Sequence, residues 1–261
     1  MGLSSAIFKK ELKIPGVITL YDVFHYFGLK TNRIEEIVKD ILKKYLLWIV
    51  DHFDAIHYPS VFAKNHFQKI IEKRKDYHIA YMPFQVPQKN NQKERNKVSY
   101  LGPIDKTFDI EKLCKVMPQI KNKTGKEIEI MAIEEREEAL EREMKDKVKK
   151  INYDERFKYY EDLICYIEPK NLLEYNFYAL ESLALGNIVI THRENATAEI
   201  LESLNMKDFI YEDETYLSDP ILKAIEINRN HEEEKYVKKE HIMKMIEDNA
   251  KIILSLYENT S

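Results

Sequence analysis

Short apolar runs alternate with segments of helical periodicity along the last two thirds of the chain. The apolar runs predict strands, and apolar positions three or four residues apart predict helices between them. We expect strands at 98–102, 127–133, 148–152, 164–168, 187–192 and 208–211. We expect helices at 109–122, 134–146, 154–162, 175–185 and 195–204, followed by a helical tail over about 216–258. This alternation is typical of a parallel, doubly wound sheet.

The first third of the chain shows the same kind of pattern on a smaller scale. Apolar runs predict strands at 16–22, 55–58 and 78–83, with helices at 3–13, 32–53 and 61–73. A polar stretch without periodicity follows at 85–97 and is the clearest linker in the sequence. The sequence therefore predicts two α/β domains joined near residue 90.

The stretch 174–191 is the most informative part of the sequence. It predicts a loop, a helix, a glycine stop and a buried strand, because Ala179, Leu180 and Leu183 share one helical face and Gly186 precedes a β-branched run. Two carboxylates, Glu174 and Glu181, bracket the first turns of the helix. A helix start favours anionic ligands, because its backbone N–H groups are free.

Composition excludes several classes of function. A net charge of −4 gives no basic footprint for nucleic acid. The two cysteines, Cys114 and Cys165, lie in apolar settings and indicate neither a disulfide scaffold nor a zinc site. No transmembrane run and no signal peptide is evident, so we expect a cytoplasmic protein. Abundant Lys, Glu and Ile fit either the ion-pair surface of a thermophile or an AT-rich genome.

The stretch 174–191 resembles the carboxylate-pair motif of glycosyltransferases with the GT-B fold, of the group 1 type that uses nucleotide-sugar donors. The spacing of the two carboxylates is one residue shorter than the family pattern, and the two loop glycines of the family are absent. An ordinary loop–helix–strand unit of an unrelated α/β protein is the alternative. The matching positions are Phe177, Leu180, Glu181, Ala184 and Gly186.

Further matches in the same order extend the resemblance over most of the chain. They are Thr19–Asp22, Asp54–Ser60, Tyr81–Pro83, Val98–Gly102, Ile164–Pro169 and Glu199. The resemblance implies a GT-B-like α/β fold with a shortened Rossmann-like N-terminal domain at 1–90. It implies a doubly wound nucleotide-sugar domain at 91–235 and a C-terminal helix at 236–261 that packs back on the first domain. The first β–α units of the family are missing, which suggests a homodimer or a partner chain that completes this domain.

The resemblance also implies residue roles. Glu181 would accept hydrogen bonds from the donor ribose, and Glu174 would lie near the transferred sugar. Tyr153 would lie close to the base. The sugar pocket would be lined by Asn176, Phe177 and Tyr178.

The cations that bind the donor diphosphate in the family are displaced. The family has an arginine after the glycine of the first strand and a lysine five residues later, where this chain has Pro103, after Gly102, and Phe108. Lys106 in the same loop and Arg193 after a later strand are the candidate replacements. An ordinary surface charge is the alternative for each, and the sequence favours it more for Arg193 than for Lys106.

The resemblance therefore implies a retaining glycosyltransferase that takes a sugar from a nucleotide-diphosphate donor to an unknown acceptor, without a cofactor or an active-site metal. A second possibility is a non-catalytic GT-B descendant that binds a nucleotide or sugar, or serves in an assembly. The displaced cations favour this second possibility, whereas the retained carboxylates favour the enzyme. Membrane contact is possible but has no support from a basic amphipathic helix.

Overall fold

The computed structural model describes residues 16–21, 33–70, 76–82, 84, 86, 95–104, 108–135, 145–171, 173 and 175–259. Contacts divide the chain into two compact units. The first unit comprises Met1–Pro83, Leu173–Tyr175 and Met245–Ser261, and the second comprises Phe84–Leu172 and Asn176–Lys244. The predicted helix at 3–13 lies outside the described residues.

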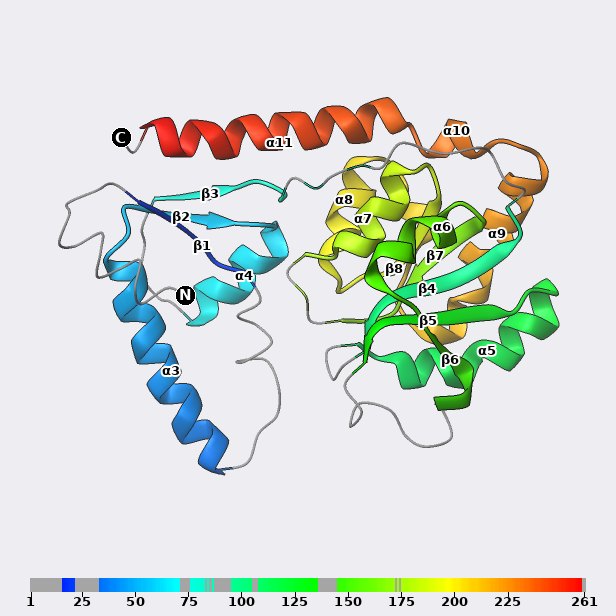
Figure 1. Ribbon diagram of the computed structural model, residues 1–261, viewed down its shortest axis with the longest axis horizontal. Coiled ribbons are helices and arrows are strands. Elements are labelled where there is room, and N and C mark those ends of the chain that lie inside the picture. The colour runs from blue at the N-terminus through cyan, green and yellow to red at the C-terminus, as the bar shows by residue number, and fades with distance from the viewer. Residues whose placement is uncertain are drawn as a thin grey trace. The chain divides into compact units, whose positions relative to one another are not determined.

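The first unit is built on a small parallel sheet in the order β1-β2-β3 (Figure 1). Its elements are β1 (Val17–Thr19), α3 (Arg33–Asp51), β2 (Ala55–Tyr58), α4 (Val61–Ile70), β3 (Tyr77–Ile79) and most of α11 (Lys239–Asn259). The buried ring of His57 on β2 links the neighbouring strands, since Nδ1 lies 3.1 Å from Thr19 Oγ1 and Nε2 lies 2.8 Å from Ala80 O. The Tyr81 amide donates to Asn249 Oδ1 of α11 at 2.8 Å.

Helix α3 is longer than the sheet it covers. Its last turns pack on the core through Leu46 and Val50, but Ile37 and Ile41 are 58% and 61% exposed. A helix of 19 residues is about 29 Å long, whereas the four residues of β2 span about 13 Å. Only the C-terminal half of the helix therefore reaches the sheet. The expectation of a partner chain for this unit stays a prediction.

The second unit contains a six-stranded, fully parallel sheet in the order β6-β5-β4-β7-β8-β9. Its elements are β4 (Lys97–Ile104), α5 (Ile110–Thr124), β5 (Ile128–Glu135), a 3₁₀ turn (Lys145–Lys147), β6 (Val148–Lys150), a 3₁₀ turn (Tyr153–Glu155), α6 (Arg156–Tyr160), β7 (Leu163–Glu168), α7 (Phe177–Ala184), β8 (Ile188–His192), α8 (Ala196–Ser203), a 3₁₀ turn (Lys207–Phe209), β9 (Ile210–Tyr211), a 3₁₀ turn (Glu214–Tyr216), α9 (Ser218–Arg229) and α10 (Glu233–Tyr236). All six predicted strands of this part are confirmed. The predicted helix at 134–146 is wrong at its start, because β5 continues to Glu135, and residues 136–144 lie outside the described part.

Helices cover both faces of this sheet. Helices α5 and α9 contact each other on one face, and α7 and α8 pack against β7 and β8 on the other (Figure 1). Right-handed crossovers require this arrangement, because the chain moves outward from the centre of the sheet in opposite directions from β4 and from β7. Every residue of β7 and β8 is buried, as expected for strands covered on both faces.

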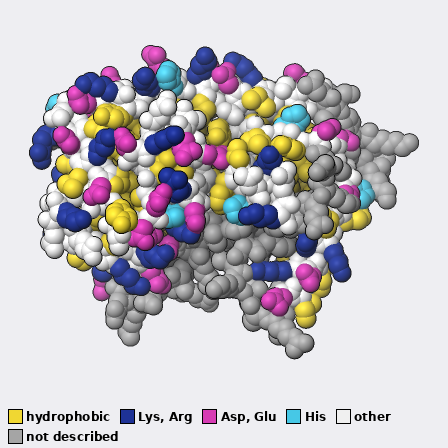
Figure 2. All heavy atoms as spheres, turned by 180° about the vertical axis from the view of Figure 1, so that it is seen from behind, with side chains coloured by type: hydrophobic (Ala, Val, Ile, Leu, Met, Phe, Trp, Pro, Cys, Tyr) yellow, Lys and Arg dark blue, Asp and Glu magenta, His cyan; other side chains and the backbone are white. Residues whose placement is uncertain are grey.

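The described surface carries interspersed charges of both signs. Figure 2 shows Lys and Arg side chains mixed with Asp and Glu side chains on one face, without a broad area of one sign among the described residues. This distribution agrees with the small net charge of −4. It offers no extended basic surface for nucleic acid on that face.

Candidate functional site at the carboxyl edge of the large sheet

The strand order of the large sheet reverses direction between β4 and β7. The chain proceeds from β4 outward to β5 and β6, returns to β7 beside β4, and then continues to β8 and β9. Open parallel sheets bind ligands outside the carboxyl ends of their strands, at the point where this reversal leaves a crevice. The carboxyl ends next to the reversal carry Ile104, Glu168 and His192.

Glu168 is fully buried at the carboxyl end of β7. Its Oε1 accepts hydrogen bonds from Asn171 Nδ2 and Asn176 Nδ2, both at 2.7 Å, and its Oε2 accepts from Thr191 Oγ1 at 2.6 Å. Burial raises the pKa of the Glu168 carboxyl, and the hydrogen bonds from Thr191 and Asn176 limit this rise. A buried carboxylate with three donors is well compensated, and its partners are held in fixed positions.

The Glu168 network fixes the loop that leads into α7. Asn176 is the N-cap residue of this helix, and its Oδ1 accepts from the amides of Tyr178 at 3.1 Å and Ala179 at 3.4 Å. The same side chain donates to Glu168, so one residue joins the helix start to the strand end. Asn195 adds a second tie, because its Nδ2 donates to Pro169 O at 2.9 Å.

Glu181 on α7 forms a bidentate ion pair with Arg156 on α6. Arg156 Nε donates to Oε2 and Nη2 donates to Oε1, both at 2.9 Å, and the two side chains are only 9% and 6% exposed. The guanidinium lies between the rings of Tyr153 and Phe157, 3.8 and 3.9 Å from their centroids. Burial acts to lower the pKa of Arg156, but its hydrogen bond and charge interaction with Glu181 outweigh burial and raise the pKa. Tyr160 Oη donates a further hydrogen bond to Glu181 Oε2 at 3.3 Å.

Gly102 allows the end of β4 to approach α7 closely. A Cβ atom at this position would lie 2.8 Å from Tyr100 Oη and 3.4 Å from Tyr178 Cδ2. The ring of Tyr100 is fully buried, and its hydroxyl donates to the carbonyl of Pro103. Any side chain larger than glycine would therefore press on the Tyr100 hydroxyl and narrow the space between β4 and Tyr178.

The described cations at this edge already have carboxylate partners. Arg193 pairs with Glu212 at 2.9 Å, and its side chain is 62% exposed. Lys112 pairs with Asp109 at 2.8 Å, and Lys170 pairs with Glu194.

The sequence-predicted residues do not all lie together. Gly102, Pro103 and Tyr178 lie together, and Tyr178 O accepts from Tyr160 Oη at 3.1 Å, next to Glu181. Arg193 pairs with Glu212, directly after β9, and among the described residues no hydrogen bond or ion pair joins its side chain to another predicted residue. Lys106 and Glu174 lie outside the described residues. Phe177, the first residue of α7, is half-buried next to the Asn176 cap, and Tyr153 is 52% exposed against Arg156.

Sequence reasoning missed Arg156 and Glu168. Arg156 lies in the charged run Asp154-Glu155-Arg156-Phe157-Lys158, which is typical of a solvated helix. The flanking aromatic residues Tyr153 and Phe157, one helical turn apart, were the available signal for a stacked guanidinium. Glu168 was treated only as the end of a strand. Its position directly after five consecutive apolar residues was the signal that it is buried.

The described residues contain no group of three or more His, Cys, Asp or Glu side chains arranged to hold a metal ion. None of the helices in the described part of the chain combines the length and the apolar character needed to cross a bilayer.

Comparison with known proteins places this geometry in a structural class. No protein-family model and no curated sequence matches the chain. Among solved structures, sucrose-phosphate synthase from Thermosynechococcus elongatus superposes with a TM-score of 0.71 at 14% identity, over 98% of this chain and 71% of that one. HepE from Anabaena, solved with UDP and glucose, gives a TM-score of 0.69 at 12% identity, over 98% and 74%.

The pneumococcal O-GlcNAc transferase GtfA, solved with UDP and GlcNAc, gives a TM-score of 0.63 at 11% identity. The match covers 99% of this chain and 54% of GtfA, and the chain spans only half the length of TarM. Identities this low establish the fold. The resemblance predicted from the sequence is confirmed at that level: this chain has the α/β fold of the GT-B glycosyltransferases.

Proposed function

We propose that this protein is a glycosyltransferase that takes a sugar from a nucleotide-diphosphate donor, with retention of configuration, to an acceptor. One observation carries the proposal: Gly102, Tyr178 and Glu181 lie close together beside the strand reversal of a GT-B sheet. Two solved proteins of similar fold hold UDP together with a sugar. A uridine donor is therefore the first to test.

The proposed ribose site is Glu181. A carboxylate offers about four lone-pair positions, and Arg156 occupies two of them. The Tyr160 hydroxyl has one proton, which it shares between Glu181 Oε2 at 3.3 Å and Tyr178 O at 3.1 Å. Glu181 can therefore accept a ribose hydroxyl without releasing Arg156. The exposed ring of Tyr153, stacked on Arg156, is the proposed neighbour of the base.

The proposed diphosphate site lies between the carboxyl end of β4 and the start of α5. The N-cap residue Asp109 makes no side-chain cap, so the first amides of α5 and the helix dipole are available to an anion. We propose Lys106, in the loop that joins β4 to α5, as one cation. Arg193 is the second, and its exposed pair with Glu212 costs only about 0–1 kcal/mol to release.

The leaving diphosphate gains negative charge as the sugar C1–O bond breaks. Fixed positive groups at that point lower the barrier, and loss of one such contact costs about 100-fold to 1,000-fold in rate. The sugar itself would lie against Glu174, Phe177 and Tyr178. The side chain of Asn176 hydrogen-bonds to Glu168 and to two backbone amides of α7. Its proposed role in the sugar pocket is therefore to fix the position of the helix start.

The non-catalytic alternative has a specific observation in its favour. Both oxygens of Glu181 are engaged by Arg156, and the cations Lys112, Lys170 and Arg193 are each paired with a carboxylate. Such a site could hold a nucleotide sugar without accelerating the cleavage of the sugar C1–O bond that releases the nucleoside diphosphate. Turnover, rather than binding, separates the two functions.

Release of the nucleotide diphosphate from UDP-glucose, UDP-N-acetylglucosamine and GDP-mannose tests the proposal, with and without sugar acceptors. We expect the wild type to turn over one of these donors. Turnover should be lost in Glu181→Ala and lowered about 100-fold or more in Arg193→Met. The control Lys158→Met should leave turnover unchanged. The Lys158 side chain is 74% exposed, and among the described residues its one ion pair is with Glu155. Binding of a nucleotide without turnover of any donor would instead support the non-catalytic alternative.

A further inference from the structure

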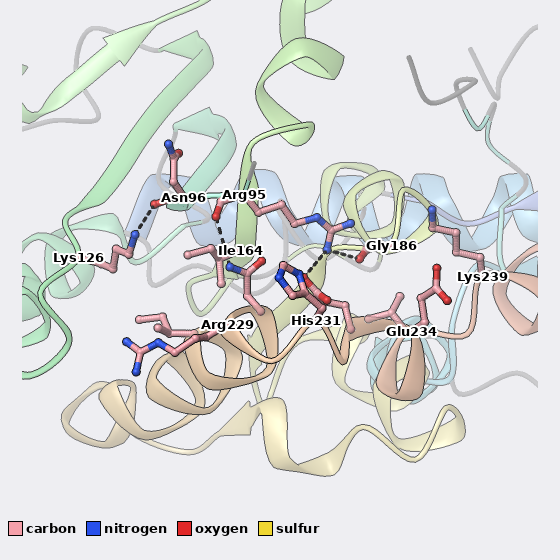
Figure 3. A pocket seen from close by; sticks show the side chains of 13 residues that line it. Arg95, Asn96, Lys126, Ile164, Gly186, Arg229, His231, Glu234 and Lys239 are labelled. Atoms are coloured by element: carbon pink, nitrogen blue, oxygen red, sulfur yellow. Dashed lines mark hydrogen bonds and ion pairs between the residues drawn. The ribbon is translucent and has the colours of Figure 1, made fainter. Parts of the chain in front are cut away.

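A second pocket lies in the same unit, at the opposite edge of the large sheet (Figure 3). It has a volume of about 920 Å³. Its lining comes from residues that precede strands: Asn96 before β4, Lys126 before β5 and Gly186 before β8. Because the strands are parallel, their amino ends share one edge, and we call this the amino-edge pocket. The candidate donor site lies at the carboxyl edge, so the two sites are separate.

Positive side chains outnumber negative ones in the amino-edge pocket. Its wall contains four cations, Arg95, Lys126, Arg229 and Lys239, and two carboxylates, Glu233 and Glu234. The protein as a whole carries a net charge of −4, so the pocket has the opposite sign to the molecule. A concave wall of one dominant sign concentrates ligands of the other sign.

The side chain of Arg95 is only 13% exposed. Its Nη1 donates to Gly186 O at 2.9 Å and lies 3.7 Å from Glu233 Oε1. Its Nε and Nη2 have no partner among the described residues. Burial lowers the pKa of Arg95, and the charges of Glu233 and Glu234 act against this shift. A half-buried guanidinium with free donors is suited to a phosphate or carboxylate oxygen.

Unlike Arg95, the other three cations have no carboxylate partner in the described part of the chain. Lys126 Nζ donates only to the backbone carbonyl of Asn96, at 3.1 Å. The side chains of Arg229 and Lys239 make no ion pair or hydrogen bond with any described residue. In Figure 3 these side chains are distributed along an elongated pocket, with Arg95 near its middle. The arrangement can hold an anionic group at one point and neutral polar groups further along.

The remaining wall indicates the rest of the ligand. The described lining contains the aliphatic residues Ile164, Ile225 and Val237, and its one aromatic ring is the small imidazole of His231, with no Phe, Tyr or Trp. Glu234 and the amide of Asn96 can accept or donate hydrogen bonds to hydroxyl groups. A volume of about 920 Å³ is at the upper end of the range for small-molecule sites.

We propose that the amino-edge pocket binds a phosphorylated sugar, with the phosphate on Arg95 and its neighbouring cations and the sugar hydroxyls toward Glu234. This site is independent of the donor site proposed above. It would remain if the protein proved to be a non-catalytic binder. A phosphosugar bound there is either a regulator or cargo, and the binding test does not depend on which.

Calorimetric titration of the full chain tests the proposal, with glucose 6-phosphate, inorganic phosphate and glucose as three separate probes. We expect glucose 6-phosphate to bind and glucose not to bind, with affinity falling as salt is raised. Arg95→Met and the double variant Lys126→Met/Arg229→Met should each weaken binding about tenfold or more, because each removes charge-assisted hydrogen bonds. The double variant removes no ion pair, and its one hydrogen bond within the described residues is that of Lys126 to Asn96 O, so we expect it to retain the fold even if Arg95→Met does not.

Two controls locate the ligand. Lys115→Met removes a lysine of the same unit that is 70% exposed and lies outside the pocket, and it should leave binding unchanged. Glu181→Ala, once circular dichroism shows that it is folded at the temperature of the titration, should also leave glucose 6-phosphate binding unchanged. Loss of binding in Glu181→Ala with retention in the double variant would place the phosphosugar in the donor site and overturn the proposal. Equal affinity for inorganic phosphate would overturn the assignment of a sugar, and no binding of glucose 6-phosphate would overturn the site.

Discussion

Arg156 and Glu181 form a buried, bidentate ion pair that joins α6 to α7. Two hydrogen bonds of 2.9 Å connect the side chains, and the rings of Tyr153 and Phe157 enclose the guanidinium. The pair occupies the carboxylate that the GT-B resemblance assigns to the donor ribose. Arg156 and the proposed donor ribose therefore bind the same two carboxylate oxygens of Glu181, and this ion pair is the first feature to test.

Removal of one partner of this pair should strongly destabilise the protein. We expect Arg156→Met to lower the free energy of unfolding by about 3–5 kcal/mol, because it leaves the Glu181 carboxylate buried without its counter-charge. The double variant Arg156→Met/Glu181→Leu should recover most of this loss, since it removes both charges together. Urea denaturation of the two variants and of Lys158→Met, which breaks an exposed pair worth about 0–1 kcal/mol, measures the effect. A loss below about 1 kcal/mol in Arg156→Met would contradict a buried pair.

The raised pKa of Glu168 predicts a dependence of stability on pH. In the unfolded chain this carboxyl loses its proton near its ordinary pKa of about 4.5, whereas burial holds the proton to higher pH in the folded chain. The folded state binds more protons between these two pKa values, so this group's contribution to stability falls as the pH rises through that interval. Glu168→Gln removes this titration.

We therefore expect the stability of Glu168→Gln, relative to the wild type, to increase between about pH 4 and pH 7. Urea denaturation of both proteins at several pH values gives the difference directly. The difference isolates Glu168, because the other titrating groups are common to both proteins. A difference that stays constant across the range would show that the pKa of Glu168 is the same in the folded and unfolded chains.

Replacement of Asn176 by aspartate should destabilise the protein more than replacement by alanine. Asn176→Ala loses the N-cap of α7, which costs about 1 kcal/mol, and one hydrogen bond to Glu168. Asn176→Asp keeps an acceptor for the helix amides but places a carboxylate oxygen where a donor now lies 2.7 Å from Glu168 Oε1. Like charges in a buried site repel, so the aspartate variant should be the less stable of the two at neutral pH. Thermal unfolding that ranks Asp above Ala would argue against the Glu168 network.

Substitution of Gly102 should affect both the packing of β4 and the binding of the donor. Gly102→Ala places a methyl group 2.8 Å from the hydroxyl of the buried Tyr100, which cannot move without breaking its hydrogen bond to Pro103. We expect a stability loss of about 1–3 kcal/mol from overpacking against Tyr100, and weaker nucleotide binding because the added methyl group fills part of the space between β4 and Tyr178. Gly125→Ala is a suitable comparison, because a Cβ there meets no atom within 4 Å and only its φ of 69° is strained. If only Gly102→Ala weakens nucleotide binding, the space between β4 and Tyr178 belongs to the donor site.

The strands of the large sheet were predictable from sequence because both faces are covered. The runs that form β7 and β8 are almost wholly apolar, and burial on both faces leaves no other place for them. Helix α3 shows the limit of such patterns. Its apolar period is regular, but the small sheet of the first unit is too short to cover Ile37 and Ile41.

The polar parts of the candidate site were less predictable because their partners are distant in sequence. Thr191 lies 23 residues from Glu168, and Arg156 lies 25 residues from Glu181. No local pattern specifies such pairs, since they form only when the crossovers bring α6, α7 and β8 together. The motif identified Glu181 but gave no indication that an arginine from another element holds it.

The most direct test of the proposed donor site is titration calorimetry of UDP and GDP against the wild type and Glu181→Ala. A nucleotide that contacts Glu181 at the carboxyl edge should bind the wild type with a dissociation constant in the micromolar range, as expected for a substrate of this size. The variant should lose about tenfold or more of that affinity. A folded Glu181→Ala that binds the nucleotide as tightly as the wild type, or a wild type that binds neither nucleotide, would contradict the proposed donor site.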